Sequence, residues 1–469
     1  MTGDRQAWLI RGARPLGGDA TDLLLVDGLI AAAGPGLTAP SGAQVLDATG
    51  LVALPGLVDL HAHLREPGRE DAETVQTGTE AAALGGFTAV HAMANTEPVA
   101  DTAGVVEQIW RLGRQAGLCD VRPVGAVTAG LGGSRLAELG AMADSAARVR
   151  VFSDDGRCVS DAVLMRRALE YVKAFDGVIA QHAQEPRLTE GAQVNEGEVS
   201  GLLGLTGWPA VAEEAIIARD CLLAAHVGSA LHVCHVSTAG SVEIIRWAKS
   251  KGWRVTAEVT PHHLLLTDEL AASYDPVYKV NPPLRTHVDV DALRAGLADG
   301  TIDCVATDHA PHPTEDKETE WQAAAFGMTG LETALRVVHA AMVETGLLDW
   351  AGVADRMSAR PAAIGRLDGR GSLDGRGSLD GRGSLDGRGS LDGSASLEAG
   401  GAPLHGRPLE PGSPANLVLY DPAAASMVDP AGHASRSRNS PFAGMELPGQ
   451  VVATFLRGTP TVLDGKLAR

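Results

Sequence analysis

The chain has 469 residues, of which 45% are hydrophobic and 21% charged, a composition typical of a globular protein with room for one large domain and a smaller one. Its formal net charge of −19 argues against a nonspecific nucleic-acid binder, because binding to phosphate requires a basic surface. Five scattered cysteines without a CxxC pair, and the lack of a signal pattern or an apolar run of about 18 residues, indicate a cytoplasmic protein with reduced thiols and no membrane span.

The two ends of the chain share a β-rich texture. Residues 1–54 alternate short apolar runs with turns, and the Asp-Gly pair at 27–28 predicts a β-hairpin. The same texture returns near the C-terminus in ANLVLYDP and VVATFLRGTPTVLDGKL. We therefore expect a small β-sandwich domain assembled from both termini, residues 1–54 and 404–469.

The middle of the chain, residues 55–365, alternates short apolar strands with amphipathic helical stretches. Helical periodicity is clearest in Asp161–Phe175, Ala212–His226 and Gly240–Gly252. The eight strand candidates are Val58–His63, Thr88–Met93, Val121–Ala126, Val149–Phe152, Val178–His182, Ala230–His235, Arg254–Val259 and Asp303–Thr307. Repeated strand-then-helix units predict a (β/α)8 TIM barrel as the catalytic domain. A doubly wound open sheet is the alternative, but no GxGxxG sequence follows the first strand.

Residues 366–403 contain a low-complexity repeat. The hexapeptide LDGRGS occurs four times in succession over residues 367–390 and is followed by two decayed copies. A hexapeptide β-helix is one interpretation, but only one residue in six is apolar, so a coil would bury almost nothing. The composition instead favours a flexible, disordered linker between the barrel and the C-terminal part of the β domain.

Polar side chains follow the predicted barrel strands at their C-terminal ends, where barrel enzymes carry their reactive groups. They are His61, His63, Asn95, Asp154, Asp155, His182, His235, Asp308, His309 and His312. Because side chains alternate along a strand, His61, His63 and Arg65 would share one face if the strand stays extended. Imidazole and carboxylate ligands in this mixture suit zinc, as one ion or two, better than magnesium. Asp154 and Asp155 are adjacent, so we expect only one of them to be a ligand, and spacing leaves the choice open.

The remaining histidines divide into two groups. An isolated histidine on a strand or helix is usually structural, and this interpretation applies to His91, His226, His232 and His339. His262 and His263 in TPHHLLL follow the seventh strand and are open to two interpretations, because they can shape the site without binding metal.

Several motifs together resemble the dihydroorotases of the amidohydrolase superfamily, and within them the stand-alone bacterial type I group. They are GLVDLHAHLREPGRE, GGFTAVHAMANTEPV, FSDDG, HVCHVSTAGSV, AEVTPHHLLL, NPPLR and ATDHAPH. The HxH pair alone indicates only the superfamily, whereas HLREPG with MANT and NPPLR is far more selective. Ala94 of MANT replaces the proline of many relatives, and the LDGRGS repeat is an insertion that the family does not require.

The resemblance implies a binuclear zinc centre. The implied ligands are His61, His63 and Asp308 for the first metal and His182 and His235 for the second. Type I dihydroorotases have an aspartate where many superfamily members have a bridging carboxylated lysine, and the matching residue is Asp155. The substrate contacts that carry over are His63, Arg65, Asn95, Asn281, His312 and the backbone at Phe326 and Gly327.

The implied reaction is the reversible hydrolysis of the cyclic amide of dihydroorotate to N-carbamoyl-aspartate, in de novo pyrimidine biosynthesis. Zinc would supply hydroxide at neutral pH and polarise the ring carbonyl. Asp308 would act as general base and then as general acid toward the departing ring nitrogen, and Arg65 would clamp the substrate carboxylate.

Two alternatives remain for the function. A hydantoinase or dihydropyrimidinase is the nearest one, although Arg65 makes little sense for a neutral ring. The other is a noncatalytic, dihydroorotase-like scaffold for aspartate transcarbamoylase, although such a protein should have lost metal ligands.

Two further expectations concern a segment near the site and the assembly of the protein. The polar segment 310–330 follows the catalytic strand, and two interpretations stay open for it: a mobile lid, which is our hypothesis, and an ordinary surface loop. The resemblance further implies a small-molecule substrate, a homodimer and an association with aspartate transcarbamoylase.

Overall fold

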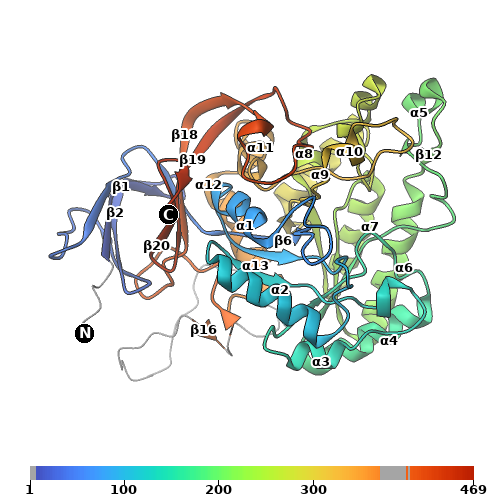
Figure 1. Cartoon of the computed structure of the whole chain (residues 1–469), viewed down its shortest axis with the longest axis horizontal. Coiled ribbons are helices and arrows are strands. Elements are labelled where there is room, and N and C mark those ends of the chain that lie inside the picture. The colour runs from blue at the N-terminus through green and yellow to red at the C-terminus, as the bar shows by residue number, and fades with distance from the viewer. Residues whose placement is uncertain (1–6, 370–397, 400–401, 469) are drawn as a thin grey trace.

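The structure, a computed structural model, describes residues 7–369, 398–399 and 402–468 of the chain. A barrel with its helices forms one part, and a sheet built from both termini lies beside it (Figure 1). Most of the predicted linker, residues 370–397 and 400–401, falls outside the described residues. None of the helices in the described ranges has the length and apolar character that a membrane span requires.

The predicted (β/α)8 barrel is confirmed. Its strands are β6 (Leu57–Ala62), β7 (Phe87–Ala92), β8 (Asp120–Pro123), β9 (Val151–Phe152), β10 (Val178–Gln181), β13 (Ala230–Val233), β14 (Val255–Val259) and β15 (Cys304–Val305). They form two parallel ladders, β6-β7-β8 and β9-β10-β13-β14-β15. Isolated parallel bridges, Gly125 with Phe152 and Ala62 with His309, join the edges of the two ladders. Each strand lies within a few residues of the range expected from the sequence.

The longer helices lie outside the barrel strands (Figure 1). The helices are α1 (Val75–Leu84), α2 (Ala103–Ala116), α3 (Leu139–Asp144), α4 (Ala162–Val172), α5 (Glu198–Leu203), α6 (Val211–Val227), α7 (Ala239–Ser250), α8 (Pro261–Leu265), α9 (His287–Asp299), α10 (Thr314–Lys317), α11 (Ala334–Val338), α12 (Trp350–Ala354) and α13 (Arg360–Ile364). Side-chain N-caps define where several of these helices begin. Asp161, Thr238 and Thr286 each accept a hydrogen bond from the backbone N–H three residues later.

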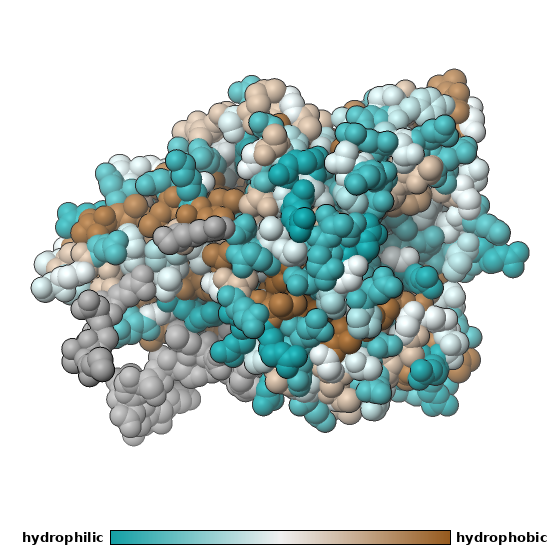
Figure 2. All heavy atoms as spheres, in the orientation of Figure 1, coloured by the Kyte–Doolittle hydropathy of each residue, from teal (hydrophilic) through white to brown (hydrophobic). Residues whose placement is uncertain are grey.

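The barrel core packs strand side chains against the inner faces of the helices. Phe87 of β7, Phe152 of β9 and Leu169 of α4 belong to one buried cluster. The barrel surface visible in Figure 2 is mostly hydrophilic, as expected when the apolar side chains face inward. β6 is buried along its whole length, so its polar residues Asp59 and His61 lie in the interior and need partners there.

Within the described residues, a mixed sheet of nine strands joins the N-terminal and C-terminal parts of the chain. Its strands are β1 (Ala7–Pro15), β2 (Thr21–Val26), β3 (Leu29–Gly34), β4 (Gln44–Asp47), β5 (Val52–Pro55), β18 (Leu417–Met427), β19 (Glu446–Leu456), β20 (Thr459–Leu463) and β21 (Lys466–Leu467). β5 pairs antiparallel with β18, which places N-terminal and C-terminal strands side by side (Figure 1). Two short pairs stand apart: β11 (Val194–Asn195) with β12 (Gly207–Trp208), and β16 (Glu398–Ala399) with β17 (Ala402–Pro403).

The terminal sheet folds over a core of its own. Trp8 of β1 packs edge-on against Phe455 of β19, with ring centroids 5.5 Å apart, although β5 and β18 separate their strands in the sheet order. Both side chains belong to one buried cluster, as expected for a sandwich. The predicted Asp-Gly hairpin is also confirmed. Asp27 and Gly28 join β2 to β3 with φ angles of 51° and 84°, which a type I′ turn requires.

Candidate metal centre and substrate pocket

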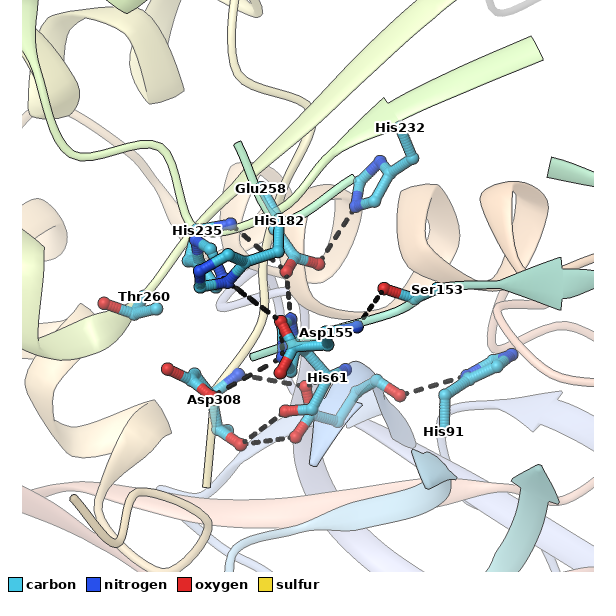
Figure 3. Close-up of polar contacts among 12 residues, drawn as sticks. His61, His91, Ser153, Asp155, His182, His232, His235, Glu258, Thr260 and Asp308 are labelled. Carbon is cyan, nitrogen blue, oxygen red and sulfur yellow. Dashed lines mark hydrogen bonds and ion pairs between the residues drawn. The ribbon is translucent and has the colours of Figure 1, made fainter. Parts of the chain in front are cut away.

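Six buried polar side chains meet at the C-terminal end of the barrel, most of them labelled in Figure 3. They are His61, His63, Asp155, His182, His235 and Asp308. They lie in or just beyond β6, β9, β10, β13 and β15, so strands far apart in the sequence contribute to one cluster. The structure therefore brings together the residues that were expected at the metal centre.

A first group of possible ligand atoms belongs to His61, His63, Asp155 and Asp308, and all of these atoms lie within 4.8 Å of one another. Nε2 of His61 is 3.3 Å from Asp155 Oδ1 and 3.5 Å from Asp308 Oδ1. Nε2 of His63 is 3.4 Å from Asp155 Oδ2 and 3.1 Å from Asp308 Oδ1. Ligand atoms at about 2.1 Å from a tetrahedral zinc ion are about 3.4 Å apart. The spacing of this group therefore fits a single cation.

A second group consists of Asp155, His182 and His235, again with ligand atoms within 4.8 Å of one another. Asp155 Oδ1 lies 3.3 Å from His182 Nδ1 and 3.3 Å from His235 Nε2. The two ring nitrogens are 2.9 Å apart. Because Asp155 belongs to both groups, its carboxylate lies between two candidate cation positions (Figure 3).

The structure shows which of the two adjacent aspartates faces the cluster, a question that residue spacing left open. Asp154 Oδ1 accepts hydrogen bonds from the backbone N–H groups of Val127 at 2.8 Å and Thr128 at 2.9 Å. Its other oxygen accepts from the Thr128 hydroxyl. Asp154 therefore holds the loop after β8, and Asp155 alone points into the cluster.

Glu258 is a site residue that the sequence interpretation missed. Its Oε1 lies 2.7 Å from His61 Nδ1, and its Oε2 lies 2.9 Å from Nε2 of His232, a histidine interpreted above as structural. A carboxylate at Nδ1 places the imidazole proton there and leaves Nε2 as a lone pair for a metal. The available signal was a glutamate within the apolar run of β14, since such a buried carboxylate requires a partner.

Two of the other three imidazoles, those of His63 and His182, have amide partners. His63 Nδ1 lies 2.9 Å from Asn95 Oδ1, and His182 Nε2 lies 2.8 Å from Gln184 Oε1. An amide oxygen accepts only a proton-bearing nitrogen, so each contact sets the tautomer of its histidine. In both rings the nitrogen that faces the carboxylates is left unprotonated.

The carboxylates give the cluster a strongly negative field. Burial disfavours protonation of His61, but the charges of Asp155, Glu258 and Asp308 raise its pKa well above the ordinary value. Nε2 of His61 is also a buried nitrogen without a hydrogen-bond partner among the described residues. A cation at this place would supply both the missing partner and the missing positive charge. The residues therefore fit a metal site.

Arg65 lies beside the cluster, but not by strand alternation. β6 ends at Ala62, and Arg65 has a φ of 60°, so the chain has already turned out of the extended conformation. Its Nε donates to the Pro311 carbonyl oxygen at 3.0 Å, and its Nη2 lies 3.4 Å from His312 Nε2. Burial lowers the pKa of Arg65 to about 10, so the guanidinium stays charged at neutral pH. The prediction that Arg65 shares one extended strand face with His61 and His63 is therefore wrong, although the Arg65 side chain still lies beside the site.

His312 is held by the segment that contains Phe326 and Gly327. Its Nε2 lies 2.9 Å from the Phe326 carbonyl oxygen. A Cβ atom on Gly327, which has a φ of 144°, would come within 2.8 Å of the same nitrogen, so glycine is required there. The Gly327 N–H donates to the Lys279 carbonyl oxygen at 2.9 Å. The backbone groups that were expected to contact substrate thus have protein partners in this structure.

Asn281 and the histidines of TPHHLLL have different surroundings. Asn281 Nδ2 donates to Gln184 Oε1 at 3.2 Å, while its buried Oδ1 has no partner among the described residues. His263 is fixed by contacts of 2.7 Å with Thr260 Oγ1 and 3.2 Å with the Pro283 carbonyl oxygen, which is a structural role. Burial lowers the pKa of His262 to about 4, and the described residues offer its Nε2 no partner.

Comparisons of sequence identify close relatives. The sequence model of the dihydro-orotase-like family matches residues 50–241. A dihydroorotase of Streptomyces coelicolor is 66% identical over 98% of this chain and 99% of its own length. The dihydroorotases of Leifsonia xyli and Mycobacterium tuberculosis are 64% and 55% identical, over 98% of this chain and 97% and 99% of their own lengths.

Comparisons of structure identify hydantoinases and dihydropyrimidinases of the same fold. The L-hydantoinase (dihydropyrimidinase) of Arthrobacter aurescens has a TM-score of 0.80 at 25% identity, over 98% of this chain and 97% of its own. The dihydropyrimidinase of Brevibacillus agri has a TM-score of 0.76 at 22% identity, over 99% and 96%, and shows the fold alone. Over nearly the whole chain, sequence identity to the three dihydroorotases is far higher than identity to the hydantoinase and the dihydropyrimidinase. The chain belongs to the dihydroorotase family.

Proposed function

We propose that the chain hydrolyses the cyclic amide of (S)-dihydroorotate reversibly to N-carbamoyl-L-aspartate, in de novo pyrimidine (UMP) biosynthesis. The observation that carries the proposal is the Asp155 carboxylate shared by two groups of metal-donor atoms, with the charged Arg65 beside them. The donor atoms suit hydrolysis, and the guanidinium suits a substrate that bears a carboxylate. Relatives named dihydroorotase at 53–66% identity support the same reaction.

The metal is proposed to be zinc, with two ions per chain. The proposed ligands are, for the first ion, His61, His63 and Asp308, for the second His182 and His235, and for both Asp155. Nitrogen and oxygen donors in this mixture are typical of zinc. Zinc bound there would act as a Lewis acid and lower the pKa of water to about 7, which makes a nucleophile available at neutral pH.

Asp308 is proposed to move the proton. Its carboxylate lies at the end of β15, with Oδ1 3.1 Å from His63 Nε2, and faces the interior of the cluster (Figure 3). It would accept the proton of the attacking water and deliver it to the ring nitrogen as the amide C–N bond breaks. The ring then opens to a new carboxyl group and a carbamoyl nitrogen that carries the delivered proton, and the second proton of the water is released when the carboxyl group ionises.

The proposed substrate contacts surround the centre: His63, Arg65, Asn95, Asn281, His312, Phe326 and Gly327. Arg65 would bind the substrate carboxylate through its Nη groups, because its Nε is engaged with Pro311. Asn95 uses its Oδ1 on His63, which leaves its Nδ2 as a donor toward substrate. A substrate group at Phe326 or Gly327 would take over the hydrogen bonds that now run to His312 and Lys279.

A combined metal analysis and substrate assay tests the proposal against both alternatives. The purified protein should contain about two zinc ions per chain and should hydrolyse dihydroorotate at least about a hundredfold faster than hydantoin or dihydrouracil, since burying an unpaired guanidinium costs several kcal/mol. Hydrolysis of hydantoin without hydrolysis of dihydroorotate would favour the hydantoinase alternative. A metal-free protein without activity on any of these substrates would favour the scaffold.

Replacing Asp308 tests the proton-transfer role. Asp308→Asn keeps the shape of the side chain but removes the base, so we expect kcat to fall by about 10²–10⁴-fold. The melting temperature should stay close to that of Asp291→Asn, a control on the exposed face of α9. Near-normal turnover in Asp308→Asn, measured at saturating dihydroorotate, would show that another group moves the proton.

Assembly and location are proposed on the same family grounds. We propose a homodimer that associates with aspartate transcarbamoylase, and size-exclusion chromatography with light scattering, with and without that partner, tests both statements. All five cysteines are free thiols, which supports a cytoplasmic location. The proposed domain boundaries are 1–54 with 404–469 for the β domain and 55–365 for the barrel.

A further inference from the structure

Gln184 lies between a candidate metal ligand and a candidate substrate contact. It follows β10 and stands two residues after His182. Its Oε1 lies 2.8 Å from His182 Nε2 and accepts a second hydrogen bond from Asn281 Nδ2 at 3.2 Å. One oxygen atom therefore contacts both functional side chains, although Asn281 is 97 residues away in the sequence.

Thr189 fixes the orientation of the Gln184 amide. The Thr189 hydroxyl donates to the Glu185 carbonyl oxygen at 3.1 Å, so its oxygen is free to accept. Gln184 Nε2 donates to that oxygen at 2.8 Å. A flipped amide would face Thr189 with an acceptor and would place two donors against His182 and Asn281. The network therefore keeps Oε1 on the side of the metal centre.

This orientation has a consequence for His182. A nitrogen that binds a cation must be unprotonated, and His182 Nδ1 is the nitrogen that faces Asp155, at 3.3 Å. The ring proton must then sit on Nε2, where Gln184 Oε1 accepts it. Outer partners of this kind commonly change metal affinity by about 10–100-fold when they are removed.

The same orientation has a consequence for Asn281. Because its Nδ2 is committed to Gln184, its Oδ1 must point the other way. That oxygen is buried and lacks a hydrogen-bond partner among the described residues. A buried acceptor of this kind is costly unless a ligand supplies a donor, and a cyclic amide carries a suitable ring N–H.

We propose that Gln184 is a positioning residue that sets the tautomer of His182 toward the metal and aims Asn281 Oδ1 at a ring N–H of the substrate. The second half of this role rests on the proposed function, whereas the first half requires only a bound metal. One acceptor atom, Gln184 Oε1, would thus determine both the tautomer of His182 at the metal centre and the orientation of Asn281 in the substrate pocket.

Two substitutions of Gln184 separate its acceptor from its bulk. Gln184→Met has a similar length but only a weak thioether acceptor, and Gln184→Glu retains a strong acceptor for both partners. Gln193→Met is the matched control, because Gln193 lies in the same segment between β10 and α6. Zinc affinity is measured by competition with a chelator on stripped and reloaded full-length protein, without substrate. We expect Gln184→Met to weaken zinc binding by about 10–100-fold, and the other two variants to stay within about threefold of the wild type.

The substrate half is tested by steady-state kinetics with zinc at saturation. Gln184→Met should raise the KM for dihydroorotate about tenfold, and Gln184→Met combined with Asn281→Ala should raise it no further than Asn281→Ala alone. Additive effects on KM would overturn the coupling to Asn281.

The two measurements distinguish this inference from the proposed function. Unchanged zinc affinity in Gln184→Met would overturn the positioning of His182, even if the wild type is a fully active dihydroorotase. Weakened zinc affinity in a protein whose wild type leaves dihydroorotate intact would support the positioning of His182 and reject the proposed function together with the substrate half.

Discussion

At the scale of single residues, neighbouring side chains place the protons of at least two imidazoles of the candidate metal centre. Glu258 does so for His61, and Asn95 does so for His63. Each contact leaves the nitrogen that faces Asp155 or Asp308 available to a cation. The chemistry of the centre therefore depends on side chains that do not themselves contact the metal.

Arg65 provides a test of substrate recognition. Arg65→Met keeps much of the apolar stem but removes the proposed charge-assisted hydrogen bonds to the substrate carboxylate, which would be worth about 2–3 kcal/mol. We expect the KM for dihydroorotate to rise about 30–150-fold while kcat changes little. Arg69→Met is the control, because Arg69 is exposed and pairs with Asp71 and Asp316. An unchanged KM in Arg65→Met would mean that the carboxylate binds elsewhere.

His91 provides a test of pH dependence. It is buried beside β6, with Nδ1 3.1 Å from the Asp59 carbonyl oxygen, and burial lowers its pKa from 6.5 to about 4. Between these values the unfolded chain binds more protons than the folded chain, so the free energy of unfolding falls as the pH drops from 6.5 to 4. The loss due to this group is up to about 3 kcal/mol.

Urea unfolding at pH 7, 5.5 and 4.5 measures this effect. His91→Asn should lose less stability on acidification than the wild type, and His226→Asn, on the exposed face of α6, should behave like the wild type. Equal losses in all three proteins would show that His91 does not stay neutral in the folded state.

At the scale of elements, two buried lysines hold the segment that positions His312. Lys279 Nζ donates to the carbonyl oxygens of Trp321 at 2.7 Å and Ala324 at 2.7 Å. Lys317 Nζ, at the end of α10, donates to those of Ala325 at 2.9 Å and Gly327 at 3.0 Å. A segment with little regular structure thus has its backbone acceptors satisfied by ammonium groups.

Limited proteolysis tests this arrangement together with the lid hypothesis for 310–330. Lys317→Met removes three hydrogen bonds to carbonyl oxygens, so cleavage within 318–327 should become severalfold faster. Lys249→Met is the control, because Lys249 pairs with Asp303 before β15. Dihydroorotate should protect the wild-type segment if it is a lid, whereas identical cleavage with and without substrate would identify an ordinary loop.

At the scale of the whole molecule, the C-terminal part of the chain completes the barrel at both ends. Asn439 Nδ2 donates to the carbonyl oxygens of Ala310 at 3.0 Å and Gly327 at 3.1 Å, beside the substrate pocket. On another part of the barrel, His405 Nε2 lies 2.8 Å from Asp120 Oδ2, at the start of β8. Residues that follow the repeat therefore contact the barrel near both of its ends.

Metal removal should lower the stability of the whole barrel. Without a cation the carboxylates of Asp155, Asp308 and Glu258 remain close together in the interior, and a metal that binds only the native state at a thousandfold excess over its Kd stabilises it by about 4 kcal/mol. Stripping with a chelator should lower Tm by several degrees in calorimetry, and added zinc should restore it while magnesium should not. An unchanged Tm after verified loss of metal would contradict this account.

The sequence by itself determined the architecture and the types of residue at the site. Alternating apolar runs located the eight barrel strands, and Asp27 with Gly28 located a hairpin, because these signals depend on neighbours in the chain. The rule that reactive groups follow barrel strands selected the histidines and aspartates that the structure places together.

Only the tertiary structure decided how those residues are used. Residue spacing could not show whether Asp154 or Asp155 points into the cluster. The answer depends on hydrogen bonds between Asp154 and Thr128, which is 26 residues away in the sequence. Glu258 is 197 residues from His61, and the contact between them leaves no local pattern in the sequence. Arg65 reaches the site through a turn that strand periodicity does not describe. Local patterns determine elements, whereas partners distant in sequence determine protonation and orientation.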